Sequence, residues 1–187
     1  MAETKLNGEE IWESHKQSQL HLGITKQPFQ IKKTSFEDVS DFNNQFGVLQ
    51  LDKPSLDDTN FIDSRMALIR EEIRELEEAV KEKDMVETVD ALTDILYVVY
   101  GMGYSLNIDL DKAFDIVHES NMSKICLNEE DAKKTVEWYK NNDTRYKTPS
   151  YRVNKAGNFV VYDVDTRKIL KSIYYKPASL REISLGK

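Results

Sequence analysis

Two long segments with helical periodicity follow one another in the middle of the chain, and they restrict the fold more than any other feature. In the first, which ends near Glu82, apolar residues recur every three or four positions. The second runs from about Met85 to Met102, and we expect Gly101 and Gly103 to end it. Only the short polar stretch "KEKD" separates them. The sequence therefore predicts an antiparallel helical hairpin.

Acidic residues lie at matching positions in the two segments. Both helices rise by about 1.5 Å per residue, so residues equally far from the break lie side by side. Glu72 and Asp94 are equally far from Lys83, and Glu75 and Asp90 are nearly so. We therefore expect five acids to meet across the hairpin: Glu71, Glu72, Glu75, Asp90 and Asp94.

Asp94 lies in the most apolar part of the chain. From Ala91 to Met102 only Thr93 and Asp94 are clearly polar, so we expect this helix to be enclosed. Converging carboxylates repel one another, and an enclosed carboxylate is unstable without a compensating cation. Mg²⁺, or Mn²⁺ in its place, prefers carboxylate oxygens and would remove this conflict. The three histidines are scattered, which argues against a zinc site.

The same residues have a structural interpretation. An EExxE string is common on exposed helices, where Arg70 and Arg74 could pair with it. Asp94 could pair with a buried Arg or Lys. The chain would then be a non-enzymatic helical interaction protein, although this leaves the three glutamates of the string unexplained.

The expected fold class is mainly α, a helical bundle of the all-α type built on the hairpin, with a small C-terminal antiparallel β meander. We expect an N-terminal arm over residues 1–33, a helical domain over 34–146 and a β-rich extension over 147–187. Other helices are expected within residues 36–46, 107–125 and 128–142.

Several details of these helices follow from capping and periodicity. Asp63 or Ser64 could cap the first hairpin helix, and Asp109 or Asp111 the helix after the hairpin. We expect Phe114 in that later helix to face inward with its apolar neighbours. The helix over 128–142 is expected to be mostly exposed.

Composition excludes some classes of protein. The chain has 187 residues and a formal net charge of −7, which argues against a partner that is a nucleic-acid polymer. We see no signal peptide and no apolar run long enough to span a membrane, so no membrane partner is expected. The single cysteine, Cys126, is expected to be an ordinary core residue in a cytoplasmic protein.

Three blocks of sequence, taken in order, resemble one family. They are "EEIRE" at Glu71–Glu75, then "DALTDILYVVYG", then "VHESNMSK". Together they resemble the all-α NTP pyrophosphohydrolases, that is, the MazG-like and phosphoribosyl-ATP pyrophosphohydrolase-like enzymes, over about Phe36 to Lys124. The tail "TRKILKSIYYKPASL" resembles one branch that carries Lys-Ser-x-x-Tyr-x-Pro.

The resemblance implies Mg²⁺-dependent hydrolysis of a (deoxy)nucleoside triphosphate to the monophosphate and pyrophosphate, in nucleotide-pool housekeeping. Hydrolysis of phosphoribosyl-ATP in histidine biosynthesis is the alternative. The family pattern is EExxE followed by ExxD. If Asp94 is the family's aspartate, its partner glutamate falls on Ala91, and Asp90 replaces the lost carboxylate. If Glu87 and Asp90 form the ExxD pair, the motif is complete but precedes the apolar block.

The hairpin positions favour Asp94, and the resemblance then suggests roles for single residues. Glu72 is the expected general base, with Glu71 as the alternative. Asn121 and Lys124 resemble the family's phosphate and sugar contacts, although Lys124 could simply balance a helix dipole. Tyr97 could stack on the base, although a tyrosine in an apolar helix is more often part of the core.

An apolar hairpin cannot cover both of its faces within one small chain. We therefore expect the protein to be a homodimer or homotetramer, as related enzymes are. The preferred base is not readable from the sequence, although Asn43, Asn44 or Gln45 could contribute to its recognition.

Overall fold

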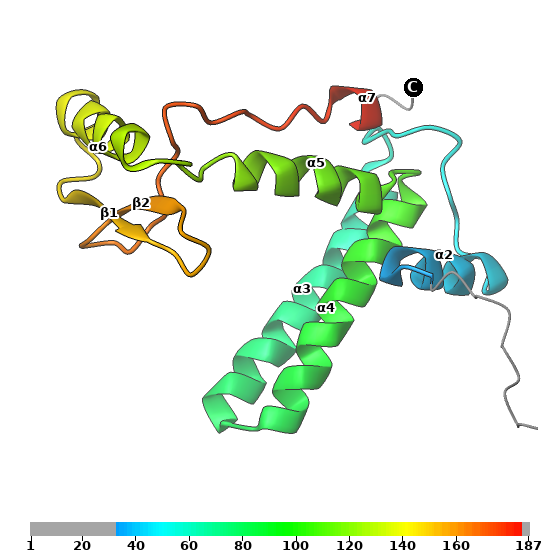
Figure 1. The fold of residues 1–187 in the computed structure, drawn as a ribbon. Coiled ribbons are helices and arrows are strands. Elements are labelled where there is room, and N and C mark those ends of the chain that lie inside the picture. The colour runs from blue at the N-terminus through cyan, green and yellow to red at the C-terminus, as the bar shows by residue number, and fades with distance from the viewer. Residues whose placement is uncertain (1–32, 185–187) are drawn as a thin grey trace, which may run out of the picture. The chain divides into compact units, whose positions relative to one another are not determined.

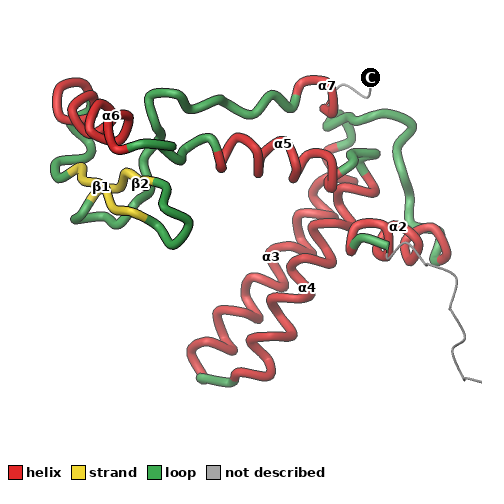
Figure 2. Tube along the Cα trace, viewed as in Figure 1, coloured by secondary structure: helices red, strands yellow, loops and turns green. Residues whose placement is uncertain are grey.

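The computed structural model describes residues 33–184, and residues 34–187 belong to one compact unit (Figure 1). The predicted arm, residues 1–33, lies almost entirely outside the described residues. The helices are α2 (Ser35–Gln45), α3 (Thr59–Glu82), α4 (Met85–Ser105), α5 (Leu110–Met122), α6 (Glu129–Asn142) and α7 (Arg181–Ser184). The strands are β1 (Pro149–Val153) and β2 (Phe159–Asp163). The predicted class, mainly helical with a small antiparallel sheet, is confirmed (Figure 2).

The predicted hairpin is formed by α3 and α4, which pack against each other in antiparallel directions (Figure 1). Lys83 ends α3 in the left-handed conformation, with φ of 59°. Asp84 then caps α4, because its side chain accepts hydrogen bonds from the backbone N–H groups of Val86 and Glu87. Both turn residues come from the polar break in the sequence.

Helix α3 begins earlier than predicted. Its N-cap is Asp58, whose side chain accepts a hydrogen bond from the backbone N–H of Phe61 at 3.0 Å. The prediction of Asp63 or Ser64 as the cap is therefore wrong. The Asp58 side chain accepts a hydrogen bond from a backbone N–H group that has no partner within the helix, so the helix begins one turn earlier than predicted.

Helix α4 continues through both glycines to Ser105, so the prediction that they end it is also wrong. Gly103 lies against Leu110, the first residue of α5. A Cβ atom there would lie 2.4 Å from Cδ1 of Leu110. The turn after the helix is made by Asn107, which adopts φ of 55°. Gly103 therefore permits helix packing instead of helix termination.

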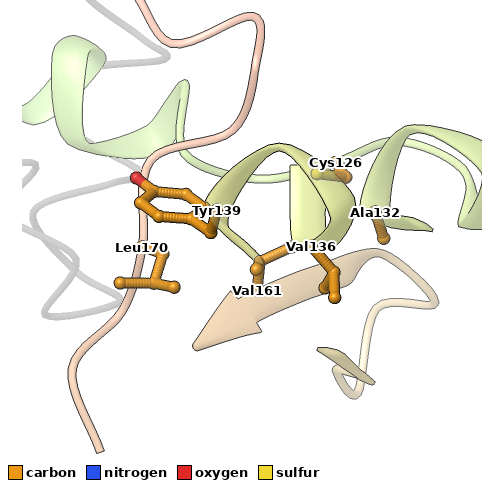
Figure 3. Close-up of a cluster of buried hydrophobic side chains, with 6 residues drawn as sticks. All are labelled: Cys126, Ala132, Val136, Tyr139, Val161 and Leu170. Atoms are coloured by element: carbon orange, nitrogen blue, oxygen red, sulfur yellow. The ribbon is translucent and has the colours of Figure 1, made fainter. Parts of the chain in front are cut away.

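A cluster of buried hydrophobic side chains joins α6 to the sheet (Figure 3). Ala132, Val136 and Tyr139 of α6 pack with Val161 of β2 and with Leu170. Most residues of α6 are exposed, as predicted, and its buried residues lie on the one face that packs against the sheet. Its buried face is what supports a sheet of two short strands, which would be marginal alone.

Cys126 and Ile169 add single bridges to this sheet. Cys126 exchanges two backbone hydrogen bonds of 2.9 Å with Phe159, and Ile169 bridges to Tyr162. Cys126 is 1% exposed and belongs to the α6 cluster, so its predicted place in the core is confirmed.

Large apolar side chains remain exposed on α4 and α5. Leu92 and Leu96 are 49% and 57% exposed, and Phe114 is 68% exposed. The expectations that α4 is enclosed and that Phe114 faces inward are therefore wrong for a single chain. None of the described helices combines the length and the apolar character needed to cross a membrane.

Candidate active site

The centre of the candidate site is Glu72, a half-buried residue in the middle of α3. Burial raises the pKa of its carboxyl group, and the charges of Glu75, Asp94, Glu71 and Asp90, in decreasing order, raise it further. Two of these four acids lie on α4. The hairpin therefore brings acids of both helices into one electrostatic neighbourhood.

Within residues 33–184, no cation forms an ion pair with these acids. Ion pairs join Lys133 to Glu129, Lys134 to Glu130 and Arg145 to Asp143, all on or near α6. Arg70 and Arg74 form no ion pair with the EExxE string in this part of the chain. The surface-pairing interpretation of the string is therefore not supported by the geometry.

The acids do not form a tight cluster in this conformation. Within the described residues, no three His, Cys, Asp or Glu side chains are arranged to hold a metal ion. Mg²⁺ is commonly held by one or two carboxylates, with water and substrate phosphates as its other ligands. An excess of carboxylate oxygens without a protein cation fits this chemistry.

The two possible assignments of the ExxD motif place its residues in different structural surroundings. Ala91 is 4% exposed, so the position that would carry the family glutamate is packed inside the fold. Asp94 is half-buried and Asp90 is exposed. Glu87 lies in the first turn of α4, where its backbone N–H binds the cap Asp84. Asp90 and Asp94, and not Glu87, are the α4 acids that act on Glu72.

Tyr97 lies on α4, one turn beyond Asp94. It is 38% exposed, and its ring meets the edge of the Phe42 ring at a centroid distance of 5.5 Å. An aromatic surface is thus accessible close to the acids. Asn43, considered for base recognition, is 5% exposed and donates its amide to the carbonyl of Val39, so it serves the packing of α2.

Asn121 and Lys124 lie together at the end of α5. Nζ of Lys124 donates a hydrogen bond of 2.6 Å to Oδ1 of Asn121. No hydrogen bond or ion pair between described residues links either of them to the acids of the hairpin. The structure therefore brings these two predicted substrate contacts to each other, but not to the acids.

The C-terminal tail docks on the end of α5 through hydrogen bonds that nothing local in the sequence indicates. Ser120 Oγ donates to the carbonyl of Lys176 at 2.8 Å, and the hydroxyls of Ser120 and Tyr175 are hydrogen-bonded to each other at 3.1 Å. The backbone N–H of Lys176 donates to Oγ of Ser123 at 2.9 Å. Ser172 Oγ also donates to the carbonyl of Ser123 at 3.3 Å. The Lys-Ser-x-x-Tyr-x-Pro stretch therefore fixes the backbone that carries Asn121 and Lys124, and the two serines of "ESNMSK" were the available signal.

The comparisons with known proteins agree with this geometry. Residues 39–121 match the family model described as phosphoribosyl-ATP pyrophosphohydrolase, a span that contains the five acids and Asn121. The chain is also 30% identical to "Uncharacterized protein L479" of Acanthamoeba polyphaga mimivirus, over 78% of this chain and 93% of that protein. A pyrophosphohydrolase activity on nucleotides is what the family supports. The chain belongs to the phosphoribosyl-ATP pyrophosphohydrolase family, within the all-α NTP pyrophosphatase superfamily.

Proposed function

We propose that this protein hydrolyses a (deoxy)nucleoside triphosphate to the monophosphate and pyrophosphate in a Mg²⁺-dependent reaction of nucleotide-pool housekeeping. The observation that carries the proposal is the environment of Glu72, whose pKa is raised first by burial and then by four neighbouring acids that no described cation balances. The family supports the coarser activity, pyrophosphate release from a nucleotide.

The acids would hold the metal between them, with Glu71, Glu72, Glu75, Asp90 and Asp94 as the candidate ligands. A bound Mg²⁺ would neutralise phosphate charge and lower the pKa of a water molecule. Glu72 is the proposed general base, with Glu71 as the alternative. A carboxylate with a raised pKa is a stronger base, which suits the removal of a proton from the attacking water.

The substrate contacts are proposed on three side chains. Lys124 would donate to the phosphates and Asn121 to the sugar, both from the end of α5 that the tail fixes. Tyr97 would stack on the base, because its accessible ring lies one helical turn from Asp94. Each contact uses a group that the structure leaves at least partly accessible.

We propose further that the protein is a cytoplasmic homodimer or homotetramer. The exposed apolar side chains of α4, such as Leu92 and Leu96, support an association of chains through this helix. A second chain would also enclose the helix that carries Asp94 and Tyr97.

The test is a product analysis of the purified full chain with a panel of NTPs, dNTPs and phosphoribosyl-ATP, each with Mg²⁺ and with EDTA. We expect monophosphate and pyrophosphate in equal amounts, only with the metal. Release of orthophosphate and a diphosphate would indicate a different hydrolase. No release from any substrate by the folded protein would favour the helical interaction protein.

Phosphoribosyl-ATP is kept as the second candidate substrate, because the matching family model carries that description. A rate on phosphoribosyl-ATP well above the rates on all NTPs and dNTPs would assign the protein to histidine biosynthesis. The reverse ranking would assign it to the nucleotide pool.

A further inference from the structure

A cavity of about 220 Å³ lies between the end of α6, the segment that follows β2 and Lys124. Four of its lining residues are cations, namely Lys124, Arg145, Lys168 and Lys171. We call this cavity the basic pocket. Four cations in one cavity are unusual for a chain whose net charge is −7.

Of the four cations, only Arg145 forms an ion pair with a carboxylate of the described part of the chain. Arg145 donates to both carboxylate oxygens of Asp143, at 2.9 and 2.7 Å. Within residues 33–184, no carboxylate lies within ion-pair distance of the three lysines. The charge of Asp143 is paired with that of Arg145, which lines the pocket.

Aromatic rings hold the lysines in place. Nζ of Lys168 lies 5.5 Å from the centre of the Tyr146 ring, and Nζ of Lys171 lies 4.3 Å from that of Tyr175. The backbone N–H of Lys171 donates to the hydroxyl of Tyr139, which is 6% exposed. Contacts with these tyrosines, of which Tyr139 is buried, therefore fix Lys168 and Lys171 at the cavity.

The pKa of the Tyr175 hydroxyl indicates a positive potential around Lys171 and Lys124. Its pKa is lowered, first by the hydrogen bond from Ser120 and also by the charges of Lys171 and Lys124. Lys124 and Lys171 are far apart in the sequence, but both act on this one group. The docking of the tail on α5 thus brings cations of two segments together.

We propose that the basic pocket binds a phosphate or pyrophosphate group of a small-molecule ligand. Lysines bind phosphate oxygens as point charges, and unpaired lysines in a cavity are available for this. The volume is below the range of about 300–1,000 Å³ that is typical of pockets for a drug-sized ligand. It therefore suits one or two phosphate groups instead of a whole nucleotide.

The inference rests on the proposed function in one respect only, that the group belongs to the nucleotide substrate or to its pyrophosphate product. Binding itself needs neither the metal nor the acids of the hairpin. Two of the three lysines that have no carboxylate partner among residues 33–184, Lys168 and Lys171, lie in the tail that the family model does not cover. The pocket would thus add phosphate contacts from the C-terminal region.

The test is calorimetric titration of the full chain with inorganic pyrophosphate in EDTA. We expect binding that weakens about tenfold or more in the double variant Lys168→Met, Lys171→Met, since each lysine supplies a charge-assisted contact. The control is Lys112→Met, Lys155→Met, which removes two exposed lysines outside the pocket and should leave the affinity unchanged. Lys124→Met, which leaves both tail lysines in place, should also weaken binding.

Several results would overturn the inference. They are no binding of pyrophosphate to the wild-type chain, equal loss in the control, or equal competition by a short oligonucleotide, which would indicate a general polyanion surface. Pyrophosphate binding that survives in Asp94→Asn would support the pocket. A chain that binds pyrophosphate but hydrolyses no nucleotide would keep the pocket and refute the proposed function, so the two failures are distinguishable.

Discussion

Glu72 on α3 and Asp94 on α4 lie close enough for the charge of Asp94 to raise the pKa of the Glu72 carboxyl group. The two residues are equally far from Lys83, the residue at which the hairpin turns. Burial has the largest effect on Glu72, and three more acids act in the same direction. The acids repel one another as a consequence of the hairpin fold, because the antiparallel packing of α3 and α4 sets the position of each acid along the helix axes.

Glu72→Gln should stabilise the metal-free fold. The raised pKa of Glu72 means that its ionised form is less favourable in the folded chain than in the unfolded chain. The protonated Glu72 side chain therefore favours folding relative to the ionised one, and this advantage is lost as pH rises through the folded pKa. In EDTA, the variant should therefore gain free energy of unfolding relative to wild type as pH rises above about 4.3, the usual pKa of Glu. We expect a few tenths of a kcal/mol, as for like charges one helical turn apart. Urea unfolding at several pH values measures this, and an equal pH dependence in both chains would contradict it.

Asp163→Asn should destabilise the sheet and change its acid sensitivity. The Asp163 carboxylate is 1% exposed and accepts hydrogen bonds from Thr166 and Thr148, which lower its pKa, most strongly through the Thr166 backbone N–H. This stabilisation is present above the unfolded pKa of about 3.9 and is lost as pH falls through the folded value. Acid unfolding followed by circular dichroism should show a shallower transition in the variant, and an unchanged transition would refute this role.

Two glycines of α4 provide a matched pair. Gly103→Ala should lower the free energy of unfolding by about 1–3 kcal/mol, because its Cβ would overlap the Leu110 side chain. Gly101→Ala meets only the Asn43 amide at 3.6 Å, and it should raise the free energy of unfolding by up to about 1 kcal/mol through helix propensity. Thermal unfolding of both variants compares them, and equal effects would contradict the packing at Gly103.

Ser120→Ala should weaken substrate binding more than the chemical step. The variant loses the hydrogen bonds to Lys176 and Tyr175 that dock the tail on α5, at a cost of about 1–3 kcal/mol in stability. Asn121 and Lys124 would then be held less firmly, so KM should rise with little change in kcat. Ser64→Ala, which removes an exposed serine on α3, is the control. A fall in kcat at constant KM would contradict this positioning role.

The hairpin and the neighbourhood of its acids could be predicted from sequence because both depend on local rules. Helical periodicity predicts α3 and α4, and the fixed rise per residue predicts that Glu72 lies opposite Asp94. The start of α3 was predicted too late, because several Asp and Ser residues could each have capped it. The choice of Asp58 depends on which backbone N–H groups are free in the folded chain.

The parts that could not be predicted depend on contacts between distant segments. Nothing local to Gly103 indicates that Leu110 packs against it, so the glycine was interpreted as a helix end. The burial of α6 depends on β2, and the docking of the tail depends on Ser120 and Ser123. The basic pocket combines Lys124 with tail lysines for the same reason.

The rate of pyrophosphate release with saturating Mg²⁺, compared among wild type, Glu72→Gln, Asp94→Asn and Glu77→Gln, tests the proposed site most directly. Glu77 is an exposed acid of α3 that is not among the charges acting on Glu72. We predict that the first two variants lose activity by about 100-fold or more, that Glu77→Gln retains it, and that EDTA abolishes it in all. Activity in Glu72→Gln and Asp94→Asn equal to that of Glu77→Gln, or release unaffected by EDTA, would show that the acids of the hairpin do not form the active site.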